Sequence, residues 1–297
     1  MLLTPELTSR LDHLDLVSRK ILRGSIQGER RSKRRGQSVE FADYRPYTVG
    51  DDLRRIDWNL YGRLDKLFLR LFLEEEDLSV TLVLDESASM RYGDPDKLRY
   101  AAELAAALGY VALSKQNSLS VHTFSGDLTP GPRGIRGRRS LPRFVDHLDQ
   151  MLNRDAPPGP GNLPQALRSL ALHHPRPGIV IVLSDFMDKH EPADAFRFLG
   201  HPRFDAHAIQ VLSPQEVDPR AADIVGDLRL TDAEDGNTAD ISATAPLIER
   251  YRANLQAFCN HLRDTCRQRG IGYLNVTTDQ PLERVALRYF QTSGLLR

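Results

Sequence analysis

The sequence contains little cysteine and no long apolar run. Its cysteines, Cys259 and Cys266, lie in a segment with helical spacing that places them on one helix face but about 10 Å apart, too far for a disulfide. The lack of a disulfide framework is typical of a reducing cytoplasm. No run approaches the ~18 apolar residues of a membrane-spanning helix. The N-terminus also lacks the charged start and apolar core of a signal peptide. We therefore predict a cytoplasmic protein without a membrane span.

Net charge is absent as well, because 40 basic residues balance 40 acidic residues. A neutral chain is not drawn as a whole to nucleic acid or to an anionic membrane, so neither is expected as a partner. The basic run Arg30–Gly36 is interpreted as a solvated loop. For the arginine-rich stretch Arg133–Arg143 two interpretations stay open, a solvated loop and an electrostatic contact with an acidic partner surface.

Common catalytic motifs are absent too. The sequence contains no G-x-x-x-x-G-K-[ST], H-E-x-x-H or G-x-S-x-G. The histidines show no metal-ligand spacing, and Ser87 has no histidine base close to it in sequence. We predict that the protein is not an enzyme, with a metal-dependent hydrolase as the second interpretation.

Apolar strands and amphipathic helices alternate through the middle of the chain. Strand-like runs occur at Val80–Leu84, Leu119–Phe124, Ile179–Leu183 and Asp205–Leu212. Helical spacing occurs between them at Lys97–Val111, Leu141–Leu152, Leu163–Leu172 and Ala193–Leu199. This alternation predicts an α/β fold, with a doubly wound, mostly parallel sheet covered by helices on both faces.

Further elements flank this region on both sides. They are a helix at Leu7–Leu22, a strand at Leu67–Glu76, a hairpin of Leu228–Leu230 with Ala239–Ile241, a helix at Leu247–Arg269, a strand at Tyr273–Thr277 and a helix at Leu282–Phe290. We predict an N-terminal extension of residues 1–77 packed on the core and an α/β domain of residues 78–212. Residues 213–297 then form a small α+β appendage that completes the fold.

The strand Val80–Leu84 ends in a turn rich in small oxygen ligands, D-x-S-x-S, formed by Asp85, Ser87 and Ser89. In open α/β folds, ligands bind at the edge of the sheet where strands of this kind end. Hard divalent cations such as Mg²⁺ bind through oxygen atoms, so this turn predicts a metal site. Taken alone, the turn favours an ordinary helix N-cap over a metal site.

A second apolar strand, Ile179–Leu183, leads to Asp185 at the same predicted edge. Two converging carboxylates repel each other unless a cation or hydrogen bonds offset the charge, which favours the metal interpretation. The Gly- and Pro-rich stretch Pro157–Leu167 enters a helix and predicts a rigid loop with exposed N–H groups.

These three segments, in this order, resemble the von Willebrand factor A fold with its metal-ion-dependent adhesion site. That site combines D-x-S-x-S, a loop threonine and a later aspartate. Asp85, Ser87, Ser89 and Asp185 match it, whereas Gly161 falls on the threonine position. Asn162 could supply an amide oxygen instead, or a water could fill the gap.

The preceding stretch, Glu40–Trp58, is similar to the signature of the domain of unknown function 58 family, whose members carry an A-type domain after it. It contains the run Gly50-Asp51-Asp52-Leu53-Arg54-Arg55-Ile56-Asp57-Trp58. We expect its acids and arginines to form ion pairs that pin the N-terminal segment onto the domain and Trp58 to be a buried anchor. A partner-docking surface is the alternative interpretation.

The resemblance implies a protein-binding adaptor for a MoxR-type AAA+ ATPase, acting in the assembly or maturation of a client protein complex. In that mechanism Mg²⁺, or Mn²⁺ or Ca²⁺, would bridge the four matching residues, with Asn162 as a further ligand, to a carboxylate of the partner. Two alternatives stay open: a metal-dependent phosphoester hydrolase, and a structural subunit with a degenerate, metal-free site.

Overall fold

The structure is a computed structural model that describes residues 2–14, 16, 40–49, 51–73, 78–155, 161–173, 177–222, 224, 226–232 and 236–286. The chain divides into two compact units. The larger comprises Met1–Ile26 and Leu78–Arg297, and the smaller comprises Gln27–Asp77. This division differs from the predicted extension of residues 1–77, because the N-terminal helix belongs to the larger unit.

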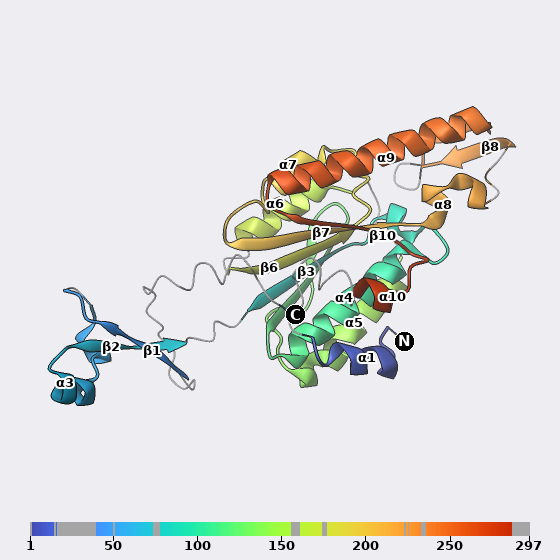
Figure 1. Cartoon of the computed structure of the whole chain (residues 1–297). Coiled ribbons are helices and arrows are strands. Elements are labelled where there is room, and N and C mark those ends of the chain that lie inside the picture. The colour runs from blue at the N-terminus through green and yellow to red at the C-terminus, as the bar shows by residue number, and fades with distance from the viewer. Residues whose placement is uncertain are drawn as a thin grey trace. The chain divides into compact units, whose positions relative to one another are not determined.

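The larger unit is built on a six-stranded sheet with the order β10-β7-β6-β3-β4-β5 (Figure 1). Its strands are β3 (Ser79–Asp85), β4 (Ser118–Phe124), β5 (Leu128–Pro130), β6 (Gly178–Ser184), β7 (Phe204–Leu212) and β10 (Gly272–Thr277). Neighbouring strands are parallel, except that β5 pairs antiparallel with β4. The predicted doubly wound α/β fold is confirmed.

Strands β3 and β6 form the centre of this sheet, and every residue of both is buried. Their aliphatic, β-branched sequences suit strands covered on both faces. They pair in parallel from Ser79 opposite Gly178 to Leu84 opposite Leu183, so both strands end at the same edge. The strand order reverses between them, and this reversal is where doubly wound sheets bind ligands.

Helices cover both faces of the sheet (Figure 1). One apolar cluster joins the sheet to α1 (Pro5–Leu11), α4 (Lys97–Ser114) and α5 (Leu141–Asn153). The other joins it to α6 (Leu163–His173), α7 (Pro192–Phe196) and α9 (Ala245–Gln268). Smaller elements complete the unit: η2 (Ala88–Arg91), η3 (Arg138–Ser140), α8 (Pro214–Val217), η4 (Pro219–Ala222), α10 (Leu282–Arg284) and an antiparallel hairpin of β8 (Gly226–Thr231) with β9 (Thr238–Ala243).

The smaller unit pairs β1 (Glu40–Pro46) antiparallel with β2 (Phe68–Leu73) and adds η1 (Leu53–Arg55) and α3 (Trp58–Leu64). Within the family signature, Asp51 pairs with Arg45 at 2.7 Å, whereas Asp52 and Asp57 cap η1 and α3. The prediction that Trp58 is a buried anchor is wrong, because its side chain is 62 % exposed. Trp58 is the first residue of α3, where it contacts Tyr61 edge-on.

Several element boundaries differ from the predicted ones. The N-terminal helix ends at Leu11, well before the predicted Leu22. Strands β1 and β5 were not predicted. Several predictions fall on residues outside the described ones. These are residues 15, 17–22, 74–76 and 287–290 of the predicted elements, residues 30–36 of the basic run and residues 157–160 of the Gly- and Pro-rich loop.

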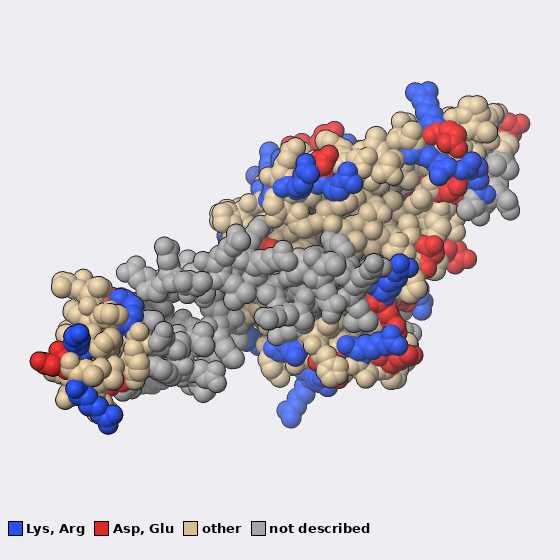
Figure 2. Space-filling model, viewed as in Figure 1, with Lys and Arg blue, Asp and Glu red and all other residues tan. Residues whose placement is uncertain are grey.

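Charged side chains of both signs are interspersed over the face of the larger unit seen in Figure 2, as expected from the neutral composition. Within the described part of the chain, no helix combines the length and the apolar character needed to cross a bilayer.

Candidate metal centre

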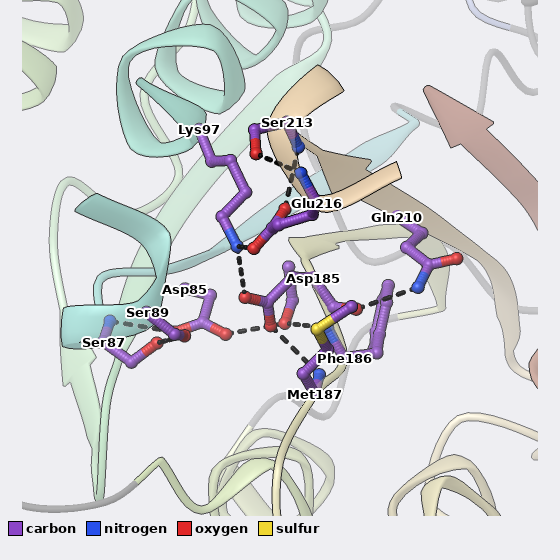
Figure 3. A network of polar contacts seen from close by, with 11 residues as sticks. Asp85, Ser87, Ser89, Lys97, Asp185, Phe186, Met187, Gln210, Ser213 and Glu216 are labelled. Atoms are coloured by element: carbon purple, nitrogen blue, oxygen red, sulfur yellow. Dashed lines mark hydrogen bonds and ion pairs between the residues drawn. The ribbon is translucent and has the colours of Figure 1, made fainter. Parts of the chain in front are cut away.

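The D-x-S-x-S turn and the second aspartate lie side by side at the carboxyl edge of the sheet. Asp85 is the last residue of β3, and Asp185 follows the last residue of β6. Both are almost fully buried, with 6 % and 2 % of their surface exposed. The predicted convergence of the two carboxylates is therefore present in the structure (Figure 3).

The turn after β3 is folded around the Asp85 carboxylate. Asp85 Oδ1 accepts a hydrogen bond from the N–H of Ser87 at 2.9 Å, which closes the turn. The hydroxyl oxygens of Ser87 and Ser89 lie 3.1 Å apart. Ser87 stands at the N-cap of η2, but its side chain makes no capping hydrogen bond. Helix α4 is capped by Asp96, so the helix-cap explanation does not account for the two serines.

Asp85 has a strongly perturbed acidity. Its burial, and the charge of Asp185 beside it, raise the pKa of Asp85 to about 7. Hydrogen bonds from Ser184 and Ser87 act in the opposite direction because they stabilise the carboxylate. The Ser184 hydroxyl donates to Asp85 Oδ2 at 2.6 Å and accepts the N–H of Phe186 at 2.8 Å. Perturbed carboxyl groups of this kind gather at functional sites.

Asp185 is held in place by the chain around it. Its Oδ1 accepts the N–H of Met187 at 3.0 Å, and its carbonyl accepts the Gln210 side chain at 3.0 Å. Phe186 adopts a left-handed backbone with φ of 58°, which is rare for a bulky residue and marks a constrained turn. The buried Phe186 ring packs edge-on against Phe196.

A buried lysine completes the network. Lys97, the first residue of α4, places its Nζ 2.8 Å from Asp185 Oδ2 and also binds Glu216 of α8 (Figure 3). Glu216 is fixed by a capping box, in which its carboxylate accepts the N–H of Ser213 at 2.8 Å and the Ser213 hydroxyl accepts the N–H of Glu216. The site therefore contains a cation of its own.

A family model described as a protein of unknown function, DUF58, matches residues 43–270. The chain belongs to the DUF58 family. Similar relatives include uncharacterised proteins of Mycobacterium bovis and Mycobacterium tuberculosis. Each is 28 % identical over 282 residues, covering 93 % of this chain and 86 % of the relative. The predicted family is thereby confirmed.

Solved structures with a similar fold include the conserved hypothetical protein BatB from Bacteroides thetaiotaomicron. It is 14 % identical, the match covers 73 % of this chain and 98 % of that chain, and the TM-score is 0.47. The VWA domain of SpRpn10 is 9 % identical, with 71 % of this chain and 93 % of that chain covered and a TM-score of 0.41.

The DUF58 chain brings four of the predicted ligands together and uses the remaining one differently. Asn162 lies near the same edge, since its N–H donates to the carbonyl of Ser125 at 2.7 Å. Its side-chain oxygen accepts the N–H of Gln165 at 3.0 Å, which is a cap on α6. A helix cap, which sequence spacing does not distinguish from a ligand, is the role its geometry supports.

The remaining donors have the chemistry that a hard cation needs. Asp85 and Asp185 offer carboxylate oxygens, and Ser87 and Ser89 offer neutral hydroxyls, all from the same edge of the sheet. Among the described residues there is no group of three or more His, Cys, Asp or Glu side chains that could hold a metal ion. A cation here would therefore depend on the serine hydroxyls, so the donor set fits Mg²⁺ better than a soft metal.

Sequence reasoning missed three residues of this network: Ser184, Lys97 and Glu216. Ser184 could have been found, because it directly precedes Asp185 at the end of a strand. Lys97 and Glu216 give no local signal. Lys97 is 88 residues from Asp185 and 119 residues from Glu216 along the chain.

Proposed function

We propose that this DUF58 protein is a protein-binding adaptor that acts in the cytoplasm with a MoxR-type AAA+ ATPase, in the assembly or maturation of a client complex. The working site is the carboxyl edge of β3 and β6. The observation that carries the proposal is the meeting of Asp85, Ser87, Ser89 and Asp185 at the reversal of strand order. Sites at this point of a doubly wound sheet are open to ligands.

In this proposal Mg²⁺, with Mn²⁺ or Ca²⁺ as substitutes, is held by Asp85, Ser87, Ser89 and Asp185. When bound, the cation would supply an electron-poor centre for a carboxylate of the partner. The protein's own contribution is to orient the oxygens. The Ser87 N–H and the Ser184 hydroxyl fix Asp85, and the Met187 N–H and Lys97 fix Asp185.

The test is recovery of a purified MoxR-type ATPase from the same organism on immobilised full-length protein, in buffer with Mg²⁺ or with EDTA. We expect recovery from wild type in Mg²⁺ only, and none from Asp85→Ala. The matched control is Asp146→Ala, which removes an exposed carboxylate from α5 and should leave recovery unchanged.

Recovery that is equal in both buffers and in Asp85→Ala would reject the metal bridge. The absence of any recovery would reject this partner. The hydrolase alternative is tested with the same preparations, because it predicts phosphoester turnover that Asp85→Ala abolishes.

A further inference from the structure

Lys97 is the most deeply buried cation identified in the described part of the chain. Its residue exposure is 0 %, and it is among the largest fully buried side chains. A buried ammonium is costly unless it is paired and hydrogen-bonded. Lys97 has two such partners, Asp185 at 2.8 Å and Glu216 at 2.5 Å.

Two carboxylates hold the Lys97 ammonium in place. Asp96 caps the start of α4 and so fixes the backbone from which Lys97 extends. The capping box with Ser213 fixes the position of the Glu216 carboxylate. In Figure 3 Nζ lies between the Asp185 and Glu216 carboxylates. The ammonium is therefore a fixed part of the site.

The same carboxylate is required by the proposed metal. Asp185 Oδ2 accepts Lys97 and Oδ1 accepts the Met187 N–H, so both oxygens are already engaged. A divalent ion bound to Asp185 would lie close to the ammonium, and like charges at that distance repel each other strongly in a buried site. The ammonium already offsets negative charge that a metal would otherwise neutralise.

We propose that Lys97 is the resident cation of the site and competes with a divalent ion for Asp185, so that it lowers the affinity of the site for metal. This inference rests on the proposed function, since it concerns the same metal-binding residues. Lys97 acts as a positioning residue, and it gives the site a preformed arrangement when no metal is bound. A partner carboxylate on the bound metal would offset part of this repulsion.

The test is a Mn²⁺ titration of the full chain followed by electron paramagnetic resonance, which reports free Mn²⁺ directly. Replacing the ammonium in Lys97→Met should tighten Mn²⁺ binding at least tenfold. Lys97→Arg keeps the charge and should stay within about threefold of wild type. Lys115→Met removes an exposed lysine at the other end of α4 and should leave binding unchanged.

A substitution of Glu216 should change the Mn²⁺ affinity in the opposite direction to Lys97→Met. Glu216→Gln leaves the ammonium paired with Asp185 alone, so Mn²⁺ binding should weaken. If Lys97→Met does not fold, the double variant with Glu216→Gln removes one charge of each sign. We expect this double variant to bind Mn²⁺ more tightly than wild type.

Equal or weaker Mn²⁺ binding by folded Lys97→Met, or by the folded double variant if Lys97→Met does not fold, with saturable binding by wild type, would overturn the competition while leaving the metal bridge intact. The absence of Mn²⁺ binding in every variant would contradict the metal bridge as well. Far-ultraviolet circular dichroism of each variant separates these outcomes from a failure to fold.

Discussion

Asp85 is a buried carboxyl group whose neighbours act on it in opposite directions. Burial and Asp185 disfavour its charged form, whereas the Ser184 hydroxyl and the Ser87 N–H favour that form. Burial and the Asp185 charge outweigh the hydrogen bonds, so the pKa of Asp85 rises from 3.8 to about 7. Because the folded state holds this proton more tightly than the unfolded state, folding takes up a proton between about pH 4 and pH 7. The free energy of unfolding therefore falls as the pH rises through that window.

Wild type should therefore lose stability from pH 5 to pH 8 relative to Asp85→Asn, whose amide keeps the shape without the titration. The difference should grow by roughly 1 to 3 kcal/mol. Urea unfolding in EDTA at a series of pH values measures it. Parallel pH profiles for the two proteins would show that Asp85 is not perturbed.

Helix α4 owes its position to close contact with α5. A Cβ built on Gly109 of α4 would lie 2.2 Å from the Phe144 ring of α5, so only glycine permits this approach. The contact fixes the axis of the helix whose first residue is Lys97. The packing of these two helices thus bears on the geometry of the site.

Gly109→Ala should lower the free energy of unfolding by about 1 to 3 kcal/mol, because overpacking outweighs the better helix propensity of alanine. Gly62→Ala is the matched control, since nothing lies within 4 Å of a Cβ at that helical position. It should be neutral or stabilising by up to about 1 kcal/mol. Thermal unfolding of both variants measures the effect, and a stabilised Gly109→Ala would contradict the packing argument.

Elements with strong local patterns were predictable, and those set by distant contacts were not. Buried strands such as β3 and β6 are continuous aliphatic runs, and the acids that follow them are visible in the sequence. Strand β5 is only three residues long and contains Pro130, so it has no periodicity to detect. Asn162 has the composition of a ligand, but the start of α6 decides its role. The Lys97 contacts depend on the tertiary fold alone.

The whole molecule consists of two units with separate internal contacts. The chain contains a single tryptophan, Trp58, and it belongs to the smaller unit. Tryptophan fluorescence therefore reports on that unit, whereas far-ultraviolet circular dichroism reports mainly on the larger one.

We predict that urea unfolding is not two-state and that these two signals do not coincide. Tyr44→Phe removes the hydrogen bond from Tyr44 to Asp57 at 2.9 Å, which joins β1 to the start of α3. It should lower the free energy of unfolding measured by fluorescence by about 1 kcal/mol. The value measured by circular dichroism should stay the same. Coincident transitions that shift together would show that the units unfold as one.

The central claim is that the edge formed by Asp85, Ser87, Ser89 and Asp185 holds a divalent cation, and calorimetric titration of the full chain with Mg²⁺ tests it most directly. The account predicts saturable binding by wild type and by the exposed control Asp146→Ala, and its loss in Asp85→Ala. Heats of dilution alone for wild type, or binding that survives in Asp85→Ala, would contradict it.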